Sequence, residues 1–324
     1  MIAHYMKNLI KPERLCRGDT IGIVAPASAP PDPKAVDRAA AALERFGFKP
    51  KLGKNVRARL GFIAGTDRER ATDLMAMFAD KNVKGIFCLR GGYGSSRILD
   101  RLDYSAIRRN PKILSGYSDI TSLHFALVKK SGLSCIHAPM LNGELADPKT
   151  PQFTRDSFFR TVMEAKPPGS ICQGYQDKTI SVLRSGVAEG RLIGGNLSLI
   201  CASLGTPYAP SFKGKILFIE DVSEKPYRVD RFLTQLLNAG VLAQVAGVAV
   251  GVNKDCHDPD AKPGGEYRQS GADVVKERLS SLRVPVVVGL PFGHIEFNAT
   301  IPVGVLAKLD GKRGDLIVTE SAVR

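Results

Sequence analysis

Short apolar runs alternate with helix-like patterns along the first half of the chain. Each run is followed by a polar or glycine-bearing stretch and then by apolar residues three and four positions apart. This alternation is typical of a parallel sheet with helices on both faces. It predicts a doubly wound α/β domain. The expected strands are 21–25, 83–89, 113–117 and 133–136, and the expected helices are 33–46, 67–78, 96–102, 120–130 and 151–165.

This rhythm breaks at residues 167–178, where two prolines and two glycines favour a linker. The chain of 324 residues is long enough for about two domains. We therefore expect an N-terminal Rossmann-like domain at 1–166 and a smaller, strand-rich C-terminal α/β domain at 179–324. The expected strands after the linker are 180–183, 187–193, 216–220, 245–252, 284–288, 301–309 and 316–319, and the expected helices are 196–204, 226–238 and 272–282.

Composition narrows the range of partners. The net charge of +14 raises the question of nucleic acid, but the basic residues are dispersed, and neither zinc-finger spacing nor an aromatic-rich RNA signature is present. We therefore expect no nucleic-acid partner. No apolar stretch approaches the roughly 18 residues of a membrane span, and the first residues lack a signal-peptide pattern, so we expect a cytoplasmic protein without a membrane partner. The six cysteines are far apart and indicate neither a disulfide framework nor a zinc site.

A glycine-rich loop follows the strand expected at 83–89. In open parallel sheets, ligands bind where such loops leave the carboxyl ends of strands. The loop Arg90-Gly91-Gly92-Tyr93-Gly94-Ser95 can form an anion-binding concavity from backbone N–H groups. A nucleotide fingerprint is poorly matched, because Arg97 replaces the third glycine of G-x-G-x-x-G and no Walker lysine follows. A tight turn without a ligand is the alternative.

Ser118 lies in a second strand exit, Gly116-Tyr117-Ser118-Asp119. A serine on a sharp turn between strand and helix is typical of a nucleophile elbow, although Ile120 replaces the second glycine of G-x-S-x-G. Serine is also a common helix N-cap, and these residues alone favour capping. A serine nucleophile needs a base beside it, and that base needs an acceptor to orient it.

The third strand exit offers a base. His294 follows Gly293 shortly after the strand expected at 284–288, although it can equally be a surface histidine. Glu220 and Asp221 end the strand at 216–220 and can orient an imidazole or merely decorate a loop. The other histidines are His4, His124, His137 and His257. The cluster at 255–260 makes a metal site conceivable, but a solvated loop is favoured and no metal site is expected.

Taken together, these motifs resemble the LD-carboxypeptidase family of serine peptidases, which includes murein tetrapeptide LD-carboxypeptidases and microcin-immunity peptidases. They occur in the family's order over nearly the whole chain. The matching stretches are 18–26, Ala64-Gly65-Thr66-Asp67 with Arg70, Arg90-Gly91-Gly92-Tyr93-Gly94, Gly116-Tyr117-Ser118-Asp119-Ile120-Thr121, Gly194-Gly195-Asn196-Leu197, Glu220-Asp221 with Tyr227-Arg228-Asp230-Arg231, and Gly293-His294.

The resemblance implies Ser118 as nucleophile, His294 as general base and acid, and Glu220 as the acceptor that orients His294. It places the site in a cleft between two domains, with the backbone N–H groups of Gly92 and Asp119 as the oxyanion hole. It further implies a homodimer without metal or cofactor that releases terminal D-alanine from murein tetrapeptide or a related muropeptide during peptidoglycan recycling. The alternative substrate is an aminoacyl-nucleotide antibiotic. The absence of tryptophan and the 7% aromatic content argue against this alternative, because such a site needs stacking groups.

Overall fold

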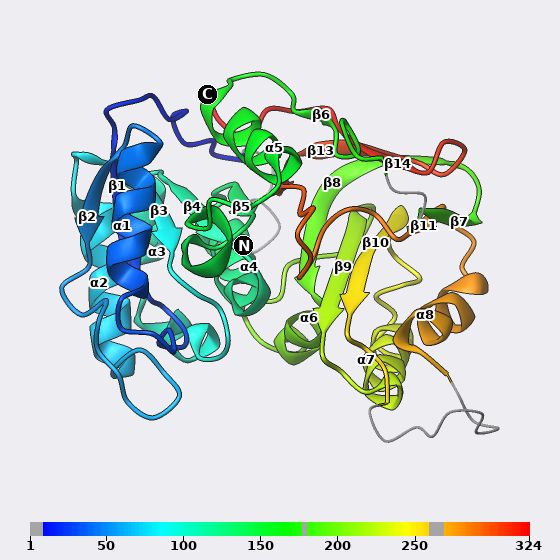
Figure 1. The fold of residues 1–324 in the computed structure, drawn as a ribbon. Helices are drawn as coiled ribbons and strands as arrows, with labels where there is room; N and C mark the ends of the chain where they lie inside the picture. Colours follow the sequence, from blue (N-terminus) through cyan, green and yellow to red (C-terminus); the bar gives the residue numbers. More distant parts are fainter. Residues whose placement is uncertain (1–8, 177–179, 259–268) are drawn as a thin grey trace.

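The chain folds into two α/β halves, each built around its own sheet (Figure 1). The computed structural model describes residues 9–176, 180–258 and 269–324. The first sheet has the strand order β12-β5-β4-β3-β1-β2, and all its pairings are parallel except that of β12 with β5. The bounds of its strands are β1 Thr20–Val24, β2 Lys49–Leu52, β3 Val83–Cys88, β4 Ile113–Gly116, β5 Cys135–His137 and β12 Ile301–Val303.

Helices cover both faces of the first sheet. Alternate strand residues point to opposite sides and pack against the helices on each face. Ile86 packs in one buried cluster with Leu74 and Leu123, whereas its neighbour Phe87 packs in another with Leu43 and Phe158. This is the expected doubly wound architecture. The helical segments of this half are α1 Ala35–Arg45, α2 Asp67–Ala79, η1 Ser95–Arg101, α3 Tyr104–Arg109, η2 Ser118–Ile120, α4 Thr121–Lys130, η3 Leu141–Leu145 and α5 Gln152–Met163.

The second sheet has the order β6-β14-β13-β8-β9-β10-β11-β7, with a parallel centre from β8 to β11 and antiparallel flanks. Its strands are β6 Gly169–Ser170, β7 Ser181–Arg184, β8 Val187–Asn196, β9 Ile216–Val222, β10 Gly247–Lys254, β11 Val286–Val288, β13 Leu306–Asp310 and β14 Asp315–Val318. Its helices are α6 Leu197–Ser203, α7 Pro226–Asn238 and α8 Gly271–Ser280. The expected mixed α/β class with two sheets is confirmed.

Several details differ from the sequence prediction. The single strand expected at 301–309 is two strands, because Gly304 has a φ of +97° and turns the chain from the first sheet to the second. The segment expected to be only a linker contributes β6 to the second sheet. The strand β2 and the short helix α3 were not predicted. The helix α1 begins after Lys34, and Thr66 and Glu69 form a capping box at the start of α2.

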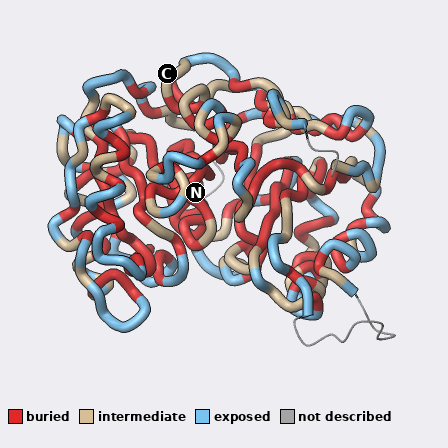
Figure 2. The backbone as a smooth tube through the Cα atoms, in the orientation of Figure 1, coloured by how far each residue is buried: buried red, intermediate tan, exposed pale blue. Residues whose placement is uncertain are grey.

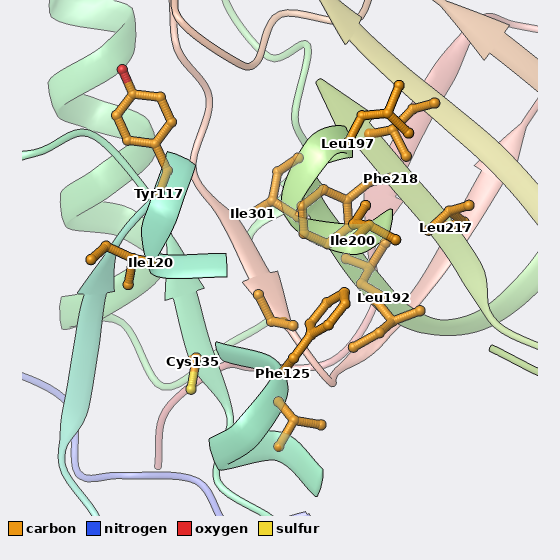
Figure 3. Packing of buried hydrophobic residues seen from close by; sticks show 14 of the residues in the cluster. Tyr117, Ile120, Phe125, Cys135, Leu192, Leu197, Ile200, Leu217, Phe218 and Ile301 are labelled. Atoms are coloured by element: carbon orange, nitrogen blue, oxygen red, sulfur yellow. The ribbon is translucent and has the colours of Figure 1, made fainter. Parts of the chain in front are cut away.

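The two halves share one apolar core. Buried residues run through both sheets and across the junction (Figure 2). Ile301 on β12 lies between the β5 and α4 side chains of the first half and Leu192 and Phe218 of the second (Figure 3). Polar contacts also cross the junction, since the backbone N–H of Asn196 donates to Thr121 Oγ1 at 3.1 Å. The residues that face each other across this junction are therefore held by packing on both sides.

Candidate active site

Ser118 occupies a strained turn between β4 and η2. Its φ is +58°, a region that non-glycine residues rarely adopt and that recurs at functional sites. Neither η2 nor α4 has a side-chain cap, and Tyr117 and Ile120 are their N-cap residues. The capping interpretation of Ser118 is therefore wrong. Its side chain is half-buried and leaves its hydroxyl available for chemistry.

The turn is crowded by the glycine loop that follows β3. A Cβ added to Gly91 would lie 3.1 Å from Ser118 Cβ and 3.4 Å from Ser118 Oγ. Gly116, which ends β4, is similarly tight, because a Cβ there would lie 3.1 Å from Cys88 Cβ. Glycine at these two positions lets the backbone of the loop approach the candidate nucleophile.

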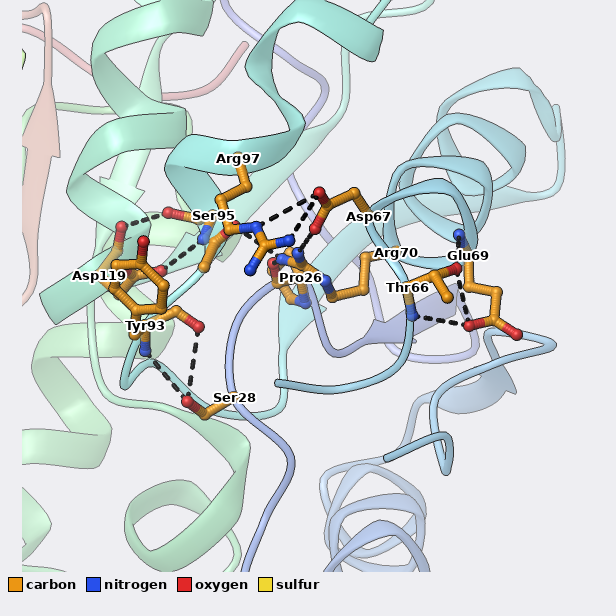
Figure 4. Close-up of polar contacts among 11 residues, drawn as sticks. Pro26, Ser28, Thr66, Asp67, Glu69, Arg70, Tyr93, Ser95, Arg97 and Asp119 are labelled. Carbon is orange, nitrogen blue, oxygen red and sulfur yellow. Dashed lines mark hydrogen bonds and ion pairs between the residues drawn. The ribbon is translucent and has the colours of Figure 1, made fainter. Parts of the chain in front are cut away.

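Buried polar contacts hold the glycine loop in place (Figure 4). Arg70 on α2 donates from Nη1 to the carbonyl oxygens of Pro26, at 2.5 Å, and Gly94, at 2.7 Å, and it pairs with Asp67. The carboxylate of Asp119 accepts the Ser95 N–H at 2.8 Å. Asp119 thus ties the loop after β3 to the turn after β4. Burial raises the pKa of the Asp119 carboxyl.

One amide N–H group of the loop and one of the Ser118 turn have no protein acceptor in the part of the chain that the structure describes. Within the described residues, neither the Gly92 N–H nor the Asp119 N–H donates a hydrogen bond. Gly92 has a φ of +95° and is exposed, and the next amide, that of Tyr93, is taken by Ser28 Oγ at 3.1 Å. Two free donors near a serine hydroxyl can bind an anionic oxygen.

Glu220 and His294 form a direct pair in the second half. His294 Nδ1 lies 2.7 Å from Glu220 Oε2, and the Glu220 side chain is fully buried at the end of β9. Gly293 makes this approach possible: its φ is +117°, and a Cβ there would lie 3.1 Å from Glu220 Cβ. Burial alone lowers the pKa of His294, but the hydrogen bond and charge of Glu220 outweigh it, so the pKa is raised.

Tyr117 links the Ser118 turn to His294. The rings of Tyr117 and His294 have centroids 4.6 Å apart, so the imidazole lies against the residue that precedes the serine. In the described part of the chain no hydrogen bond joins Ser118 to His294. The structure thus brings all three side chains to the junction of the halves and shows one of the two hydrogen bonds that a triad requires.

Sequence reasoning assigned no role to two residues near the Glu220–His294 pair, Tyr117 and Glu144. Tyr117 donates its hydroxyl to Glu144 Oε1 at 2.6 Å, and the Met140 N–H donates to Glu144 Oε2 at 2.5 Å. No local pattern marks Glu144, which lies in an irregular segment 26 positions after Ser118. Asp221, considered with Glu220, instead accepts from Asn196 Nδ2 at 2.8 Å, and burial raises its pKa to about 7.

The remaining histidines lie elsewhere. His124 and His137 are buried, and His257 is exposed in the loop after β10. His4 and residues 259–260 of the suspected metal loop fall outside the described residues. Across the described ranges no group of three or more histidine, cysteine or acidic side chains is placed to hold a metal ion. None of their helices is long and apolar enough to cross a lipid bilayer.

Two cavities adjoin the His294 loop. The larger, of about 640 Å³, extends from His294 over the ends of β10 and β11 toward α8. Basic and aromatic side chains line it, among them Lys254, Lys276, Tyr175 and Phe297. The smaller, of about 220 Å³, is lined by Glu144 and Glu296 from opposite sides. The larger cavity has the size of a small-molecule site.

The fold and the site define a two-domain α/β protein with a serine on a strained turn and a carboxylate-bound histidine beside it. The profile of the LD-carboxypeptidase N-terminal domain matches residues 21–138, and that of the LD-carboxypeptidase C-terminal domain matches residues 189–309. The chain therefore belongs to the LD-carboxypeptidase family of peptidases, as its motifs predict.

Individual relatives match almost the full length. A "Probable murein peptide carboxypeptidase" of Bacillus subtilis is 39% identical, with 93% of this chain and 91% of the relative covered. The "Murein tetrapeptide carboxypeptidase" of Pseudomonas aeruginosa is 32% identical, with 90% and 94% covered. Among solved structures, "Microcin C7 self immunity protein MccF in the inactive mutant APO state" superposes with a TM-score of 0.86 at 28% identity, covering 98% of this chain and all of that one.

Proposed function

We propose that this protein is a serine LD-carboxypeptidase that removes the terminal D-alanine from a murein tetrapeptide. The observation that carries the proposal is the contact of His294 Nδ1 with the buried Glu220 carboxylate, beside a serine held at positive φ. Matches to murein peptide carboxypeptidases support the substrate class. Cytoplasmic peptidoglycan recycling and the homodimer that the family resemblance implies remain predictions.

The proposed reaction starts with proton transfer from Ser118 Oγ to His294 Nε2. Glu220 holds Nδ1 and stabilises the imidazolium that forms. Oγ attacks the carbonyl carbon on the L side of the scissile bond, and the resulting oxyanion accepts from the free N–H groups of Gly92 and Asp119. The C–N bond then breaks, and D-alanine leaves with the proton from His294.

The second half of the reaction hydrolyses the ester on Ser118. Water gives a proton to His294 Nε2 and attacks the acyl carbon, and Ser118 recovers its proton as the C–O bond breaks. The 640 Å³ cavity beside His294 offers room for the rest of the substrate, and Lys254 and Lys276 on its wall match an anionic group.

A microcin-immunity type of peptidase is the second candidate. Phe153, Tyr175 and Phe297 form a group with ring centroids 5.5 to 6.1 Å apart, and two of these side chains border the larger cavity. Such rings can stack on a nucleobase, which the low aromatic content of the chain did not lead us to expect. The likeness to the MccF structures supports the same candidate.

Mass spectrometry of a purified murein tetrapeptide after incubation with the protein tests the proposal. The wild type should release D-alanine, and Ser118→Ala should lose activity by several orders of magnitude, because without Oγ no acyl-enzyme forms. Ser96→Ala, which changes an exposed serine on η1, is the matched control and should retain activity. Hydrolysis of an aminoacyl sulfamoyl nucleoside with the tetrapeptide left intact would favour the second candidate. Undiminished activity of Ser118→Ala would refute both.

A further inference from the structure

Glu144 is a carboxylate near the imidazole of His294 that no step of the proposed reaction uses. Both of its oxygens are held: Oε1 accepts from the Tyr117 hydroxyl at 2.6 Å, and Oε2 accepts from the Met140 N–H at 2.5 Å. Its backbone is also fixed, because the Thr150 hydroxyl donates to the Glu144 carbonyl. Such a fully held side chain is rigid rather than a solvated surface acid.

Tyr117 connects Glu144 to the catalytic histidine. The Tyr117 side chain is 6% exposed, its ring lies 4.6 Å from the His294 ring, and its hydroxyl is fixed by Glu144. His137 packs edge-on against the same tyrosine at 5.6 Å. The tyrosine ring is therefore held in one orientation, and the imidazole packs against it at an interplanar angle of 49°.

The titratable groups around His294 come from four segments in the two halves of the chain. They are Glu220 and Asp221 from β9, Glu144 from η3, His137 from β5 and Tyr117 from the turn after β4. The charges of Glu220, Glu144 and Asp221 all raise the pKa of His294. Burial raises the pKa of Glu144 itself to about 7, against the opposing effect of its hydrogen bonds and of His294.

We propose that Tyr117 and Glu144 are a positioning pair for His294: the tyrosine ring supports the imidazole, and the Glu144 charge stabilises its protonated form. The pair acts beside Glu220 and not in its place, since Glu220 supplies the carboxylate that contacts His294 Nδ1. The proposal rests on the proposed role of His294 as the base, but the effect of the charge can be measured without substrate.

The first measurement is an NMR titration of the His294 ring in wild type and in Glu144→Gln. The amide can still accept a hydrogen bond, but it carries no negative charge. The midpoint of the His294 titration should therefore fall by at most about 0.5 to 1 pH unit, because Glu144, with a pKa of about 7, is ionised over only part of that titration. Asp147→Asn is the matched control, because Asp147 lines the same smaller cavity, is exposed, and its carboxylate accepts from the Lys149 backbone N–H at 2.9 Å. It should leave the midpoint within 0.2 pH units of wild type, within about the error of such a titration.

Kinetics provide the second measurement. Because the base must be neutral to accept a proton, the acid limb of the kcat/KM profile follows His294 and should move to lower pH in Glu144→Gln by the same amount. The second variant, Tyr117→Phe, keeps the ring and removes the hydroxyl that holds Glu144. It should lower kcat about three- to tenfold with little change in KM, since the positioned imidazole acts in the transition state.

Equal His294 midpoints and superimposable pH profiles in wild type and Glu144→Gln would overturn the inference about the charge. An unchanged kcat in Tyr117→Phe would overturn the inference about positioning. These outcomes can be distinguished from a failure of the proposed function. If the wild type cleaves no tetrapeptide but the titration shift occurs, the positioning pair is supported and the substrate assignment is refuted. If Glu144→Gln does not fold, Tyr117→Phe still tests the pair.

Discussion

At the scale of single residues, the site depends as much on absent side chains as on present ones. Gly91 and Gly293 each lie where a Cβ would press on a functional side chain, Ser118 in one case and Glu220 in the other. Because these contacts are close but not impossible, the two glycines set the distance between functional groups and not simply the path of the chain. Substitution at Gly91, which does not need a positive φ, should affect chemistry before it affects stability, whereas substitution at Gly293 would also strain the backbone.

Gly91→Ala tests this view. The new methyl group, 3.1 Å from Ser118 Cβ, must displace the serine by a few tenths of an ångström, and we expect kcat to fall about 10- to 100-fold. The free energy of unfolding in urea should change by less than about 2 kcal/mol, since Gly91 does not need a positive φ. Steady-state kinetics and urea denaturation measure the two quantities. A kcat equal to that of wild type would show that the serine tolerates the crowding.

The sequence predicted residues at strand exits better than residues that meet only in space. Ser118, Glu220 and His294 each follow an apolar strand, so position and chemistry together mark them. Glu144 carries no such mark, and although Tyr117 lies at the same strand exit as Ser118, its contact with Glu144 depends on the irregular path of η3. Local reasoning also favoured a cap for Ser118. The structure overrules it because the chain turns at positive φ before the helix starts.

At the scale of elements, α2 supports the glycine loop through one buried side chain. Arg70 points from α2 to the carbonyl oxygens of Pro26 and Gly94, and Asp67 on the same helix pairs with it. The capping box at Thr66 fixes where this helix begins and hence where Arg70 points. A helix remote from the serine thus helps to hold the glycine loop in position.

Arg70→Leu should therefore harm both stability and activity. Two carbonyl groups and the Asp67 carboxylate lose their buried partner, at a cost of about 3 to 5 kcal/mol in the free energy of unfolding. At temperatures where the variant is still folded, kcat should fall about tenfold or more as the loop loses its support. Arg68→Leu, on the exposed side of the same helix, is the control and should change stability by less than about 0.5 kcal/mol. Equal effects of the two substitutions would contradict the role of Arg70.

Hydrophobic periodicity found nearly every long element, because burial on one or two faces leaves a strong pattern. Periodicity failed where one apolar run contains two strands that pair in different sheets. The run at 301–309 is apolar apart from Gly304 and Lys308, yet β12 pairs in the first sheet and β13 in the second. Only tertiary contacts distinguish these partners, and the glycine between them is the single local sign of a bend. The exposed strand β2 was not predicted for the opposite reason: it has no apolar face.

At the scale of the whole molecule, the shared core carries buried ionisable groups of opposite effect on stability. Burial raises the pKa values of Asp221 and Glu144 to about 7. On unfolding between about pH 4 and 7 these carboxyls release protons, so their contribution to stability declines as pH rises through that range. Burial lowers the pKa of His124 to about 3 and that of His137 well below its usual value. Their contribution to the free energy of unfolding declines as pH falls. The trends of the carboxyls and of the histidines therefore oppose each other, and the pH dependence of the whole protein's stability shows neither one separately.

His124→Leu should expose the histidine contribution. Both ring nitrogens of His124 lack partners among the described residues, and the ring is fully buried in α4. Below about pH 6.5 the unfolded chain binds a proton at this residue and the folded chain does not, so wild type loses about 1.4 kcal/mol per pH unit that the leucine variant keeps. Urea unfolding at several pH values measures the difference between the two proteins. That difference should be constant above pH 7.5, whatever the packing of leucine, and should shift in favour of the variant as pH falls from 6 to 5. A difference independent of pH would mean that His124 is protonated in the folded protein, and the shared core would then have to contain a partner for it.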